Sequence, residues 1–155
     1  MNRRVIGFDL EPGMIDYAIR RAEKANLADR HQLFVDDMTS FASQIEPRSV
    51  GLALNVINTI RHLESDADLL AHFEQIAQTL HPDGVYVVGI SLSLYGSEMP
   101  SEDIWSGKRG RCEVKQVANY DPPDPTSGTR QEAVYSTLTV TRPSGETLIS
   151  TSYKL

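Results

Sequence analysis

The sequence predicts an α/β fold: a mainly parallel sheet with helices on both faces, followed by an antiparallel β extension. Two amphipathic helical patterns alternate with four short apolar segments in the first 92 residues. Two of those segments, residues 50–57 and 85–90, are apolar on both faces, which is typical of buried parallel strands. After residue 92 the alternation of β-branched and polar residues indicates antiparallel strands. We therefore expect a core over residues 1–92 and an extension over residues 93–155.

The first apolar segment, Val5–Asp9, ends in an acid before a Pro-Gly pair and predicts a buried strand. A helix is expected over residues 14–27, where apolar residues recur at helical spacing. Pro12 suits its first turn, because the missing N–H has no partner to lose there. His31–Val35 reads as the next strand and is again closed by acids.

The second helix is predicted between the two strands that are apolar on both faces. Ser65 or Asp66 can cap it, and Leu69, Phe73 and Ile76 form one apolar stripe. The His-Pro-Asp-Gly segment at residues 81–84 should end the helix and lead into the strand at 85–90. These elements complete the predicted core.

The extension is expected to begin with a loop over residues 93–110, which are rich in Gly, Ser and charge. Strands are predicted at residues 113–118, 131–141 and 146–153, and Pro143-Ser144-Gly145 joins the last two in a hairpin. Pro122, Pro123 and Pro125 interrupt the chain between the first two of them.

The composition limits the classes of partner. With 21 acids and 15 bases among 155 residues the formal net charge is −6, so the chain has no basic footprint for nucleic acid. No apolar segment approaches the ~20 residues that a membrane helix needs, and we expect a soluble, cytoplasmic protein. The single cysteine, Cys112, excludes an internal disulfide framework and a multi-cysteine zinc site, and no metal site is predicted.

Carboxylates follow two neighbouring strands of the predicted sheet. Asp9 ends the first strand and Asp37 follows the second, and ligands of open α/β sheets bind at the carboxyl ends of strands. A carboxylate there can accept hydrogen bonds from a ribose diol or from an adenine amino group, and Leu10 and Met38 could sandwich the purine. The alternative is that both acids only cap the helices that follow them.

Three further residues could line the same crevice or cover it. Asn58 and His62 follow the third strand, although a single histidine at such a place is more often a structural hydrogen-bonding group. Trp105, within the expected loop, could close over a substrate or could fix that loop to the core.

Taken in order, these motifs resemble the S-adenosylmethionine-dependent class I methyltransferases, including the small-molecule, glycine N-methyltransferase-like group. The resemblance rests on Gly7-Phe8-Asp9 with Met14, on Asp37-Met38, on residues 54–63 with Asn58 and His62-Leu63, and on Leu80-His81-Pro82-Asp83-Gly84. It implies a Rossmann-like sheet and S-adenosylmethionine as cofactor, bound by Asp9, Leu10, Met14, Asp37, Met38 and Asn55. It also implies that Asn58 and His62 lie near the methyl group or its acceptor, and that Trp105 and the extension cover a small-molecule acceptor.

The sequence departs from the family pattern at both ends. The family's first strand, with its Gly-x-Gly-x-Gly turn, has no counterpart before Val5, and its last helix and final strands would be expected after Leu155. We therefore expect a partial sheet with unpaired strand edges, where each buried, unsatisfied backbone group costs about 1–3 kcal/mol. The Val5 strand should then pair with the Val50 strand, or the edges should be completed by self-association or by a missing segment, or the chain should be poorly stable.

The expected function is methyl transfer from S-adenosylmethionine to a small molecule, by a fragment of a larger methyltransferase. The protein would mainly position two reactants in line, so that no dedicated base is required. Two alternatives stay open: a non-catalytic, methyltransferase-like remnant or subunit, and a nicotinamide dinucleotide-binding domain, since an acid after the second strand also suits that ribose.

Overall fold

The computed structural model describes residues 3–124, 126, 128 and 130–155, so the chain break predicted at Pro125 lies outside the described residues. The chain divides into two compact units: Met1–Val56 with Ser65–Val88, and Ile57–Glu64 with Gly89–Leu155. We call them the first and the second unit and describe each by itself. Segment 57–64 belongs to the second unit although its chain neighbours belong to the first.

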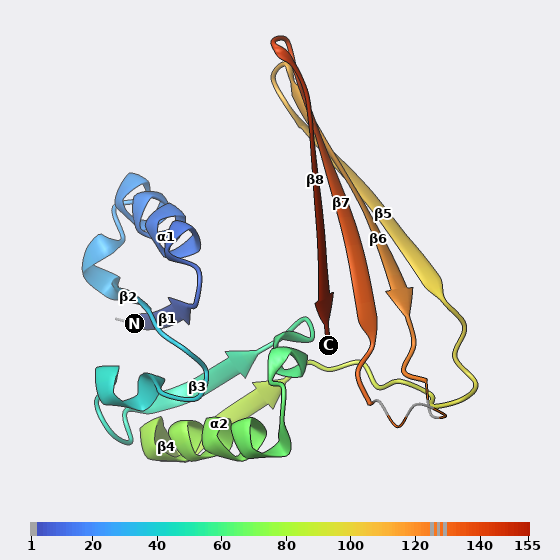
Figure 1. Cartoon of the computed structure of the whole chain (residues 1–155). Coiled ribbons are helices and arrows are strands. Elements are labelled where there is room, and N and C mark those ends of the chain that lie inside the picture. The colour runs from blue at the N-terminus through green and yellow to red at the C-terminus, as the bar shows by residue number, and fades with distance from the viewer. Residues whose placement is uncertain (1–2, 125, 127, 129) are drawn as a thin grey trace. The chain divides into compact units, whose positions relative to one another are not determined.

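The first unit contains two strand–helix–strand segments (Figure 1). Its main elements are β1 (Val5–Asp9), α1 (Pro12–Lys24), β2 (His31–Val35), the 3₁₀ turn η2 (Phe41–Gln44), β3 (Val50–Asn55), α2 (Asp66–Thr79) and β4 (Leu80–Val88). The predicted strands at β1 and β2 are confirmed at both ends. Helix α1 lies two to three residues earlier than the predicted range 14–27, and Pro12 opens its first turn as expected. Helix α2 begins at the predicted cap, because the Ser65 side chain accepts from the Asp68 N–H at 3.1 Å.

The strands of the first unit form two separate parallel sheets of two strands each, β1–β2 and β3–β4. The register of the first runs without interruption from Val5 opposite His31 to Asp9 opposite Val35. Among the described residues β1 does not pair with β3, so the first of the three alternatives for the open edges, pairing of the Val5 strand with the Val50 strand, is wrong. Within the described part of the chain, each sheet keeps strand edges with no ladder partner.

An aromatic cluster forms the core between these elements. Phe41 of η2 is 2% exposed and stacks on Phe8 of β1 with ring centroids 4.4 Å apart. Phe8 in turn stacks on Phe34 of β2, and Phe41 also contacts His72 of α2. The cluster therefore connects the β1–β2 sheet to α2 through side chains, without a backbone ladder.

One face of the β3–β4 sheet is exposed, in contrast to the prediction that both faces are buried. Leu52 and Leu54 of β3 are 58% and 62% exposed, and their register partners Val85 and Val87 of β4 are also exposed. The residues between them along each strand point to the other face and are half-buried. An apolar strand pattern indicates that both faces suit burial, but only the tertiary structure decides what covers them.

Strand β4 begins at Leu80, five residues earlier than predicted. The His-Pro-Asp-Gly segment lies within it as an irregularity, because the register shifts between the Val50–Leu80 and Leu52–Val85 pairs. At Gly84 a Cβ atom would lie 2.7 Å from the Val50 carbonyl oxygen. Glycine is required there by the close approach of the neighbouring strand.

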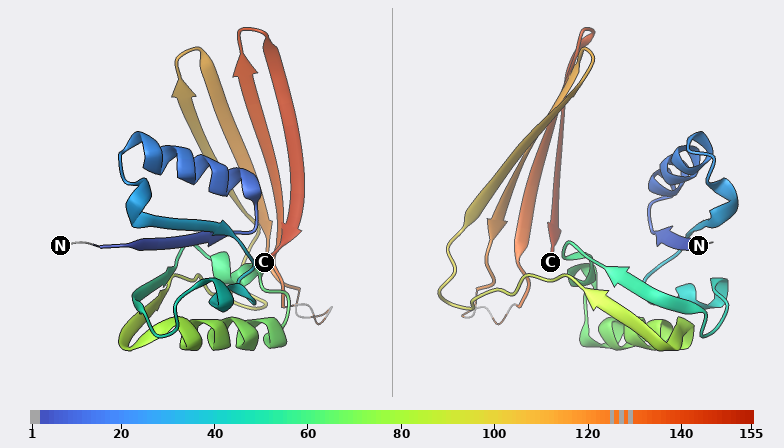
Figure 2. Two further views of the ribbon diagram at one scale, coloured as in Figure 1. Left: turned by 90° about the vertical axis from the view of Figure 1, so that its left-hand side faces the viewer. Right: turned by 180° about the vertical axis from the view of Figure 1, so that it is seen from behind.

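The second unit is dominated by one four-stranded antiparallel sheet (Figure 2). Its strands, in spatial and chain order, are β5 (Ser101–Arg109), β6 (Cys112–Asp121), β7 (Ala133–Arg142) and β8 (Gly145–Lys154). The predicted hairpin of the last two strands is confirmed. The loop predicted over residues 93–110 is wrong in its second half, because β5 pairs with β6 along its whole length in spite of its polar sequence.

Segment 57–64 enters the second unit through an unusual backbone conformation. Strand β3 ends at Asn55, two residues before the predicted end, and Ile57 and Asn58 both have positive φ, 59° and 61°. A β-branched residue is a conformational outlier in the left-handed region, and Ile57 is 88% exposed. The 3₁₀ turn η3 (Thr59–His62) follows directly.

Candidate functional site

Asp9 lies at the carboxyl end of β1, where its side chain begins the turn into α1. Its Oδ1 accepts the Glu11 N–H at 2.9 Å, as the capping alternative predicts. Its second carboxylate oxygen has no described protein partner. Leu10 and Met14 beside it are 68% and 55% exposed, so this end of the strand presents a carboxylate oxygen between apolar side chains.

Asp37 is held by local hydrogen bonds of the same kind. Its Oδ1 accepts the Thr39 hydroxyl at 2.6 Å and the Thr39 N–H at 2.7 Å. These hydrogen bonds, the hydroxyl more than the N–H, lower the pKa of Asp37 against the opposing effect of burial. Asp37 is therefore an ionised acceptor in a fixed turn, again with Oδ2 left for another donor.

The two carboxylates follow neighbouring strands. Asp9 pairs with Val35 in the ladder, and the Asp36 N–H donates to the Asp9 carbonyl at 3.2 Å, so the backbones stay adjacent as far as the residue before Asp37. Both aspartates act as local caps, but each does so with one oxygen. The capping role and the predicted ribose and adenine roles are therefore compatible.

Met38 is contacted from two elements of the first unit. The Asn55 amide donates to the Met38 sulfur at 3.4 Å, and a ring nitrogen of His72 lies 3.0 Å from the Met38 carbonyl. Asn55 Oδ1 is buried without a hydrogen-bond partner among the described residues. Met38 and Asn55, two of the predicted cofactor residues, are thus brought together. The contribution of His72 was not predicted, although its place on the apolar stripe between Leu69 and Ile76 is a signal for a buried histidine.

In the second unit, segment 57–64 is fixed by polar contacts. Asn58 Oδ1 accepts the Ser91 N–H at 2.6 Å and the Ser91 hydroxyl at 3.0 Å. Arg61 forms an ion pair with Glu132 at 3.1 Å, and both side chains are nearly buried, at 13% and 10% exposure. His62 lies against the ring of Tyr153 with centroids 5.6 Å apart.

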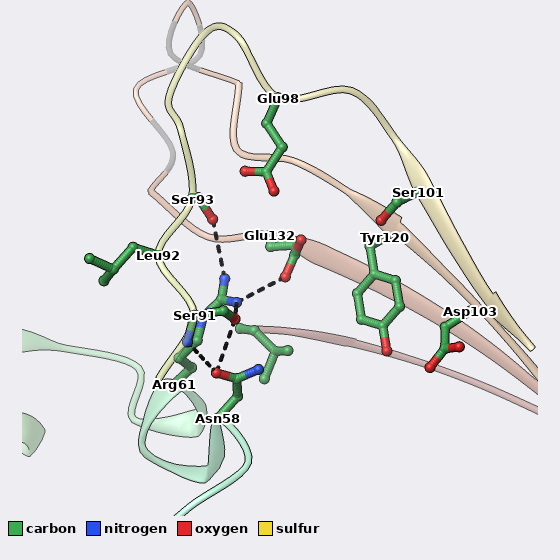
Figure 3. Close-up of a pocket in the computed structure, with 11 residues that line it drawn as sticks. Asn58, Arg61, Ser91, Leu92, Ser93, Glu98, Ser101, Asp103, Tyr120 and Glu132 are labelled. Atoms are coloured by element: carbon green, nitrogen blue, oxygen red, sulfur yellow. Dashed lines mark hydrogen bonds and ion pairs between the residues drawn. The ribbon is translucent and has the colours of Figure 1, made fainter. Parts of the chain in front are cut away.

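A cavity of about 300 Å³ lies within the second unit (Figure 3). Its lining residues are Asn58, Arg61, Ser91, Leu92, Ser93, Glu98, Ser101, Asp103, Tyr120, Glu132 and Leu155. Its size is near the lower end for small-molecule sites. The lining is polar and holds three acidic side chains against one arginine. Burial, and then the charges of Tyr153, Asp103 and Glu132, raise the pKa of Tyr120, so that its hydroxyl keeps its proton.

Of the acceptor-side candidates, only Asn58 lines this cavity. Trp105 lies on strand β5 and not in a loop; it is 49% exposed, and its indole N–H donates to the Gln116 side chain on β6. Arg61 and Glu132 could not be predicted from the sequence, because the ion pair joins residues 71 positions apart in the chain. No periodic pattern indicates a contact of that kind.

The carboxylates, the exposed apolar side chains beside Asp9 and the placement of Met38 fit the adenosine part of S-adenosylmethionine. No described residues of the first unit form a glycine-rich turn for the methionine part. Among the described residues no helix is long and apolar enough to cross a bilayer.

Comparison with protein families finds a match to the methyltransferase domain over residues 1–84. Among solved structures, the sugar N-methyltransferase KedS8 from a Streptoalloteichus species is similar with a TM-score of 0.73 and 16% identity, over 97% of this chain and 55% of that one. An S-adenosylmethionine-dependent methyltransferase from Clostridium acetobutylicum is similar with a TM-score of 0.74 and 14% identity, over 98% of this chain and 57% of that one. CalS10, an amino pentose methyltransferase from Micromonospora echinaspora, is similar with a TM-score of 0.66 and 18% identity, over 98% of this chain and 58% of that one.

The chain thus spans a little more than half the length of these structures. At such low sequence identity, the similarity shows only that the fold is shared. Comparison with curated proteins finds no match. The family match covers more than half of the 155 residues. The α/β architecture with its two helices is a fragment of the Rossmann-like fold of these neighbours, as predicted. The chain belongs to the methyltransferase domain family.

Proposed function

We propose that this protein takes part in methyl transfer from S-adenosylmethionine to a small-molecule acceptor. The observation that supports it most directly is the placement of Asp9 and Asp37 after adjacent parallel strands, within the segment that matches the methyltransferase domain. When bound, the cofactor supplies a sulfonium methyl group, which is reactive enough to need no metal or covalent intermediate.

The residues of the first unit bind and orient the adenosine part. Asp9 accepts hydrogen bonds from the ribose hydroxyls, and Asp37 accepts one from the adenine amino group. Leu10 and Met38 cover the faces of the purine, Met14 adds apolar surface, and Asn55 holds the Met38 side chain. These roles need the second carboxylate oxygens, which the local caps leave available.

Calorimetric titration of the chain with S-adenosylhomocysteine tests this assignment. Asp9→Asn keeps an oxygen for the Glu11 N–H but removes the charge, so it should weaken binding about tenfold, as expected for a lost charged hydrogen bond. Asp16→Asn, an exposed aspartate on α1, is the matched control and should bind like the wild type.

Two outcomes would redirect the proposal. Equal affinity of Asp9→Asn and the wild type would remove the ribose role. A folded chain that gives no heat with S-adenosylhomocysteine would favour the non-catalytic alternative, and a preference for NAD in the same titration would favour the dinucleotide alternative.

For the acceptor, we propose a hydroxylated small molecule that carries an amino group. The charge of Arg61 is compensated by Glu132, so Glu98 and Asp103 leave the cavity of the second unit negative. An ammonium group is attracted by such a site, whereas a phosphate or carboxylate is repelled. Two of the structural neighbours are described as methyltransferases of a sugar nitrogen and of an amino pentose, which supports the same class.

Ligand-detected NMR with glucosamine, glucose and glucose 6-phosphate tests the acceptor class. Glucosamine should bind more tightly than glucose, and glucose 6-phosphate least. Asp103→Asn should reduce the preference for glucosamine by up to about fivefold, the value of a well-placed exposed ion pair. Glu113→Gln, at the opposite end of β6 from Tyr120, is the control. Equal binding of the three sugars would contradict the proposal.

A further inference from the structure

His72 is a buried histidine whose two ring nitrogens are both engaged. It lies on α2 and is 2% exposed, among the rings of Phe41, Phe73 and Tyr86. Nδ1 lies 3.0 Å from the Met38 carbonyl oxygen, and Nε2 lies 2.6 Å from the Tyr86 hydroxyl. A polar side chain this deep in an aromatic cluster is stable only because both nitrogens have partners.

The partners fix the tautomer of His72. A carbonyl only accepts, so Nδ1 carries the hydrogen and donates it to Met38. Nε2 of the neutral ring is then an acceptor, and the Tyr86 hydroxyl donates to it. Burial raises the pKa of Tyr86, against a hydrogen bond from Asn55 that lowers it, so the hydroxyl keeps the proton that this arrangement needs. The chain of donors thus runs from Tyr86 through His72 to the backbone of Met38.

The segment that receives this hydrogen bond is the turn after β2. Within it Asp37 accepts two hydrogen bonds from Thr39, and Asp36 accepts one from the Ser40 hydroxyl. These contacts are local and fix the shape of the turn. The contacts to Met38, from His72 to its carbonyl and from Asn55 to its sulfur, connect the turn itself to α2 and β3. Just after the turn, the Ala42 N–H also donates to the Gln75 side chain of α2 at 2.8 Å.

We infer that His72 is a positioning residue that sets the base specificity of the cofactor site. By holding the Met38 carbonyl it fixes Met38 against the purine face and the Asp37 carboxylate opposite the adenine amino group. Tyr86 supports it by fixing the tautomer. The inference rests on the proposed function, because it takes adenine as the ligand of this turn.

Two substitutions at position 72 test the roles of the two ring nitrogens of His72 separately. The amide nitrogen of His72→Asn can take the place of Nδ1 and keep the donation to Met38, whereas the longer His72→Gln reaches toward Tyr86 and loses Met38. Both remove the same buried ring, so a general loss of stability affects them alike. Thermal unfolding followed by circular dichroism confirms that the two variants are matched.

The first measurement compares S-adenosylhomocysteine with S-inosylhomocysteine, in which the amino group is replaced by a carbonyl. The wild type should prefer the adenine compound by about tenfold, since the lost bond is to a charged acceptor. His72→Gln should reduce this preference to twofold or less, and His72→Asn should keep it. An equal preference in both variants would overturn the specificity role, because a merely structural histidine changes both affinities together.

The second measurement needs no ligand. Amide hydrogen exchange of Thr39 and Ser40, whose N–H groups bond to Asp37, reports the order of the turn. Exchange there should rise about tenfold in His72→Gln and stay near wild type in His72→Asn, with the β1 amides unchanged. Unchanged amide exchange in His72→Gln would overturn the inference. If exchange changes as expected but the wild type does not bind S-adenosylhomocysteine, only the proposed function is contradicted.

Tyr86→Phe keeps the test decisive if both His72 variants unfold. It removes one oxygen and the donor that fixes the tautomer, and it keeps the aromatic ring in the cluster. Exchange at Thr39 and Ser40 should rise severalfold in this variant. Wild-type exchange in folded Tyr86→Phe would contradict the proposed chain of donors.

Discussion

The parallel strand pairs of the first unit and the antiparallel sheet of the second are stabilised in different ways. In the first unit the two strands of each pair are separated along the chain by a helix, and the β3–β4 register is interrupted. In the second, β5–β6 and β7–β8 are joined by two-residue turns, and the register of each neighbouring pair runs unbroken. The outer strands β5 and β8 are exposed along their whole length.

This difference shows which interactions stabilise each unit and position its candidate site. The first unit depends on side-chain packing between separate sheets, and its candidate residues lie in turns that such packing positions. The second unit depends on local backbone ladders, which form readily because the strands are close in sequence. Its cavity is closed by contacts to segment 57–64, most directly by the Arg61–Glu132 ion pair.

The largest expected effect comes from the aromatic cluster. Phe41→Ala should lower the free energy of unfolding of the first unit by about 3–5 kcal/mol, because a fully buried ring is lost. Val134, fully buried on β7, is the counterpart in the second unit. Amide hydrogen exchange should show loss of protection in β1 and β2 for Phe41→Ala, and in β6 and β7 for Val134→Ala. Loss of protection throughout the chain in both variants would contradict the comparison.

The close approach at Gly84 gives the next largest effect. Gly84→Ala should destabilise the first unit by about 1–3 kcal/mol, because the new Cβ would meet backbone atoms that cannot move aside. Gly51→Ala on the paired strand and Gly107→Ala on β5 have open space or an ordinary contact, and both should stay within about 0.5 kcal/mol of wild type. Urea unfolding measures all three; equal effects at Gly84 and Gly51 would argue against the tight β3–β4 contact.

A stabilising change is expected where segment 57–64 begins. Ile57→Asn should raise stability by about 1 kcal/mol, since asparagine tolerates the left-handed backbone and the exposed isoleucine loses no packing. Ile149→Asn, in the extended backbone of β8, should destabilise by a few tenths of a kcal/mol. A destabilised Ile57→Asn variant in thermal unfolding would show that the isoleucine side chain stabilises the fold by more than its positive φ costs.

The smallest effect concerns Asp37. Its lowered pKa means that it stabilises the native state above its usual pKa, and that this contribution is lost as the pH falls through the lowered value. Thr39→Val removes the hydroxyl donor and keeps the N–H, so the pKa of Asp37 should rise part of the way to its usual value. Carboxylate NMR titration measures this; the cost in stability at neutral pH should stay below about 1 kcal/mol because the carboxylate is only partly buried and solvent screens it. An unchanged pKa would exclude the hydroxyl as its main cause.

Much of the local structure was predictable. The strands β1 and β2, the starts of both helices and the hairpin of β7 and β8 follow from apolar periodicity, caps and turn residues. Strand β5 was not predictable, since its sequence is polar and it forms a strand only by pairing with β6. Asp9, Asp37 and Met38 could be proposed as site residues because they follow apolar strands, whereas His72, Arg61 and Glu132 make contacts with residues distant in sequence.

The sequence by itself determined most of the elements other than β5, the order of the family motifs and the position of the strand-end carboxylates, because these depend on residues close together in the chain. Only the tertiary structure decided that β1 and β3 stay in separate sheets, that His72 holds Met38, and that segment 57–64 joins the antiparallel sheet around a cavity. Such contacts depend on the packing free energy of distant segments, and local periodicity does not encode that.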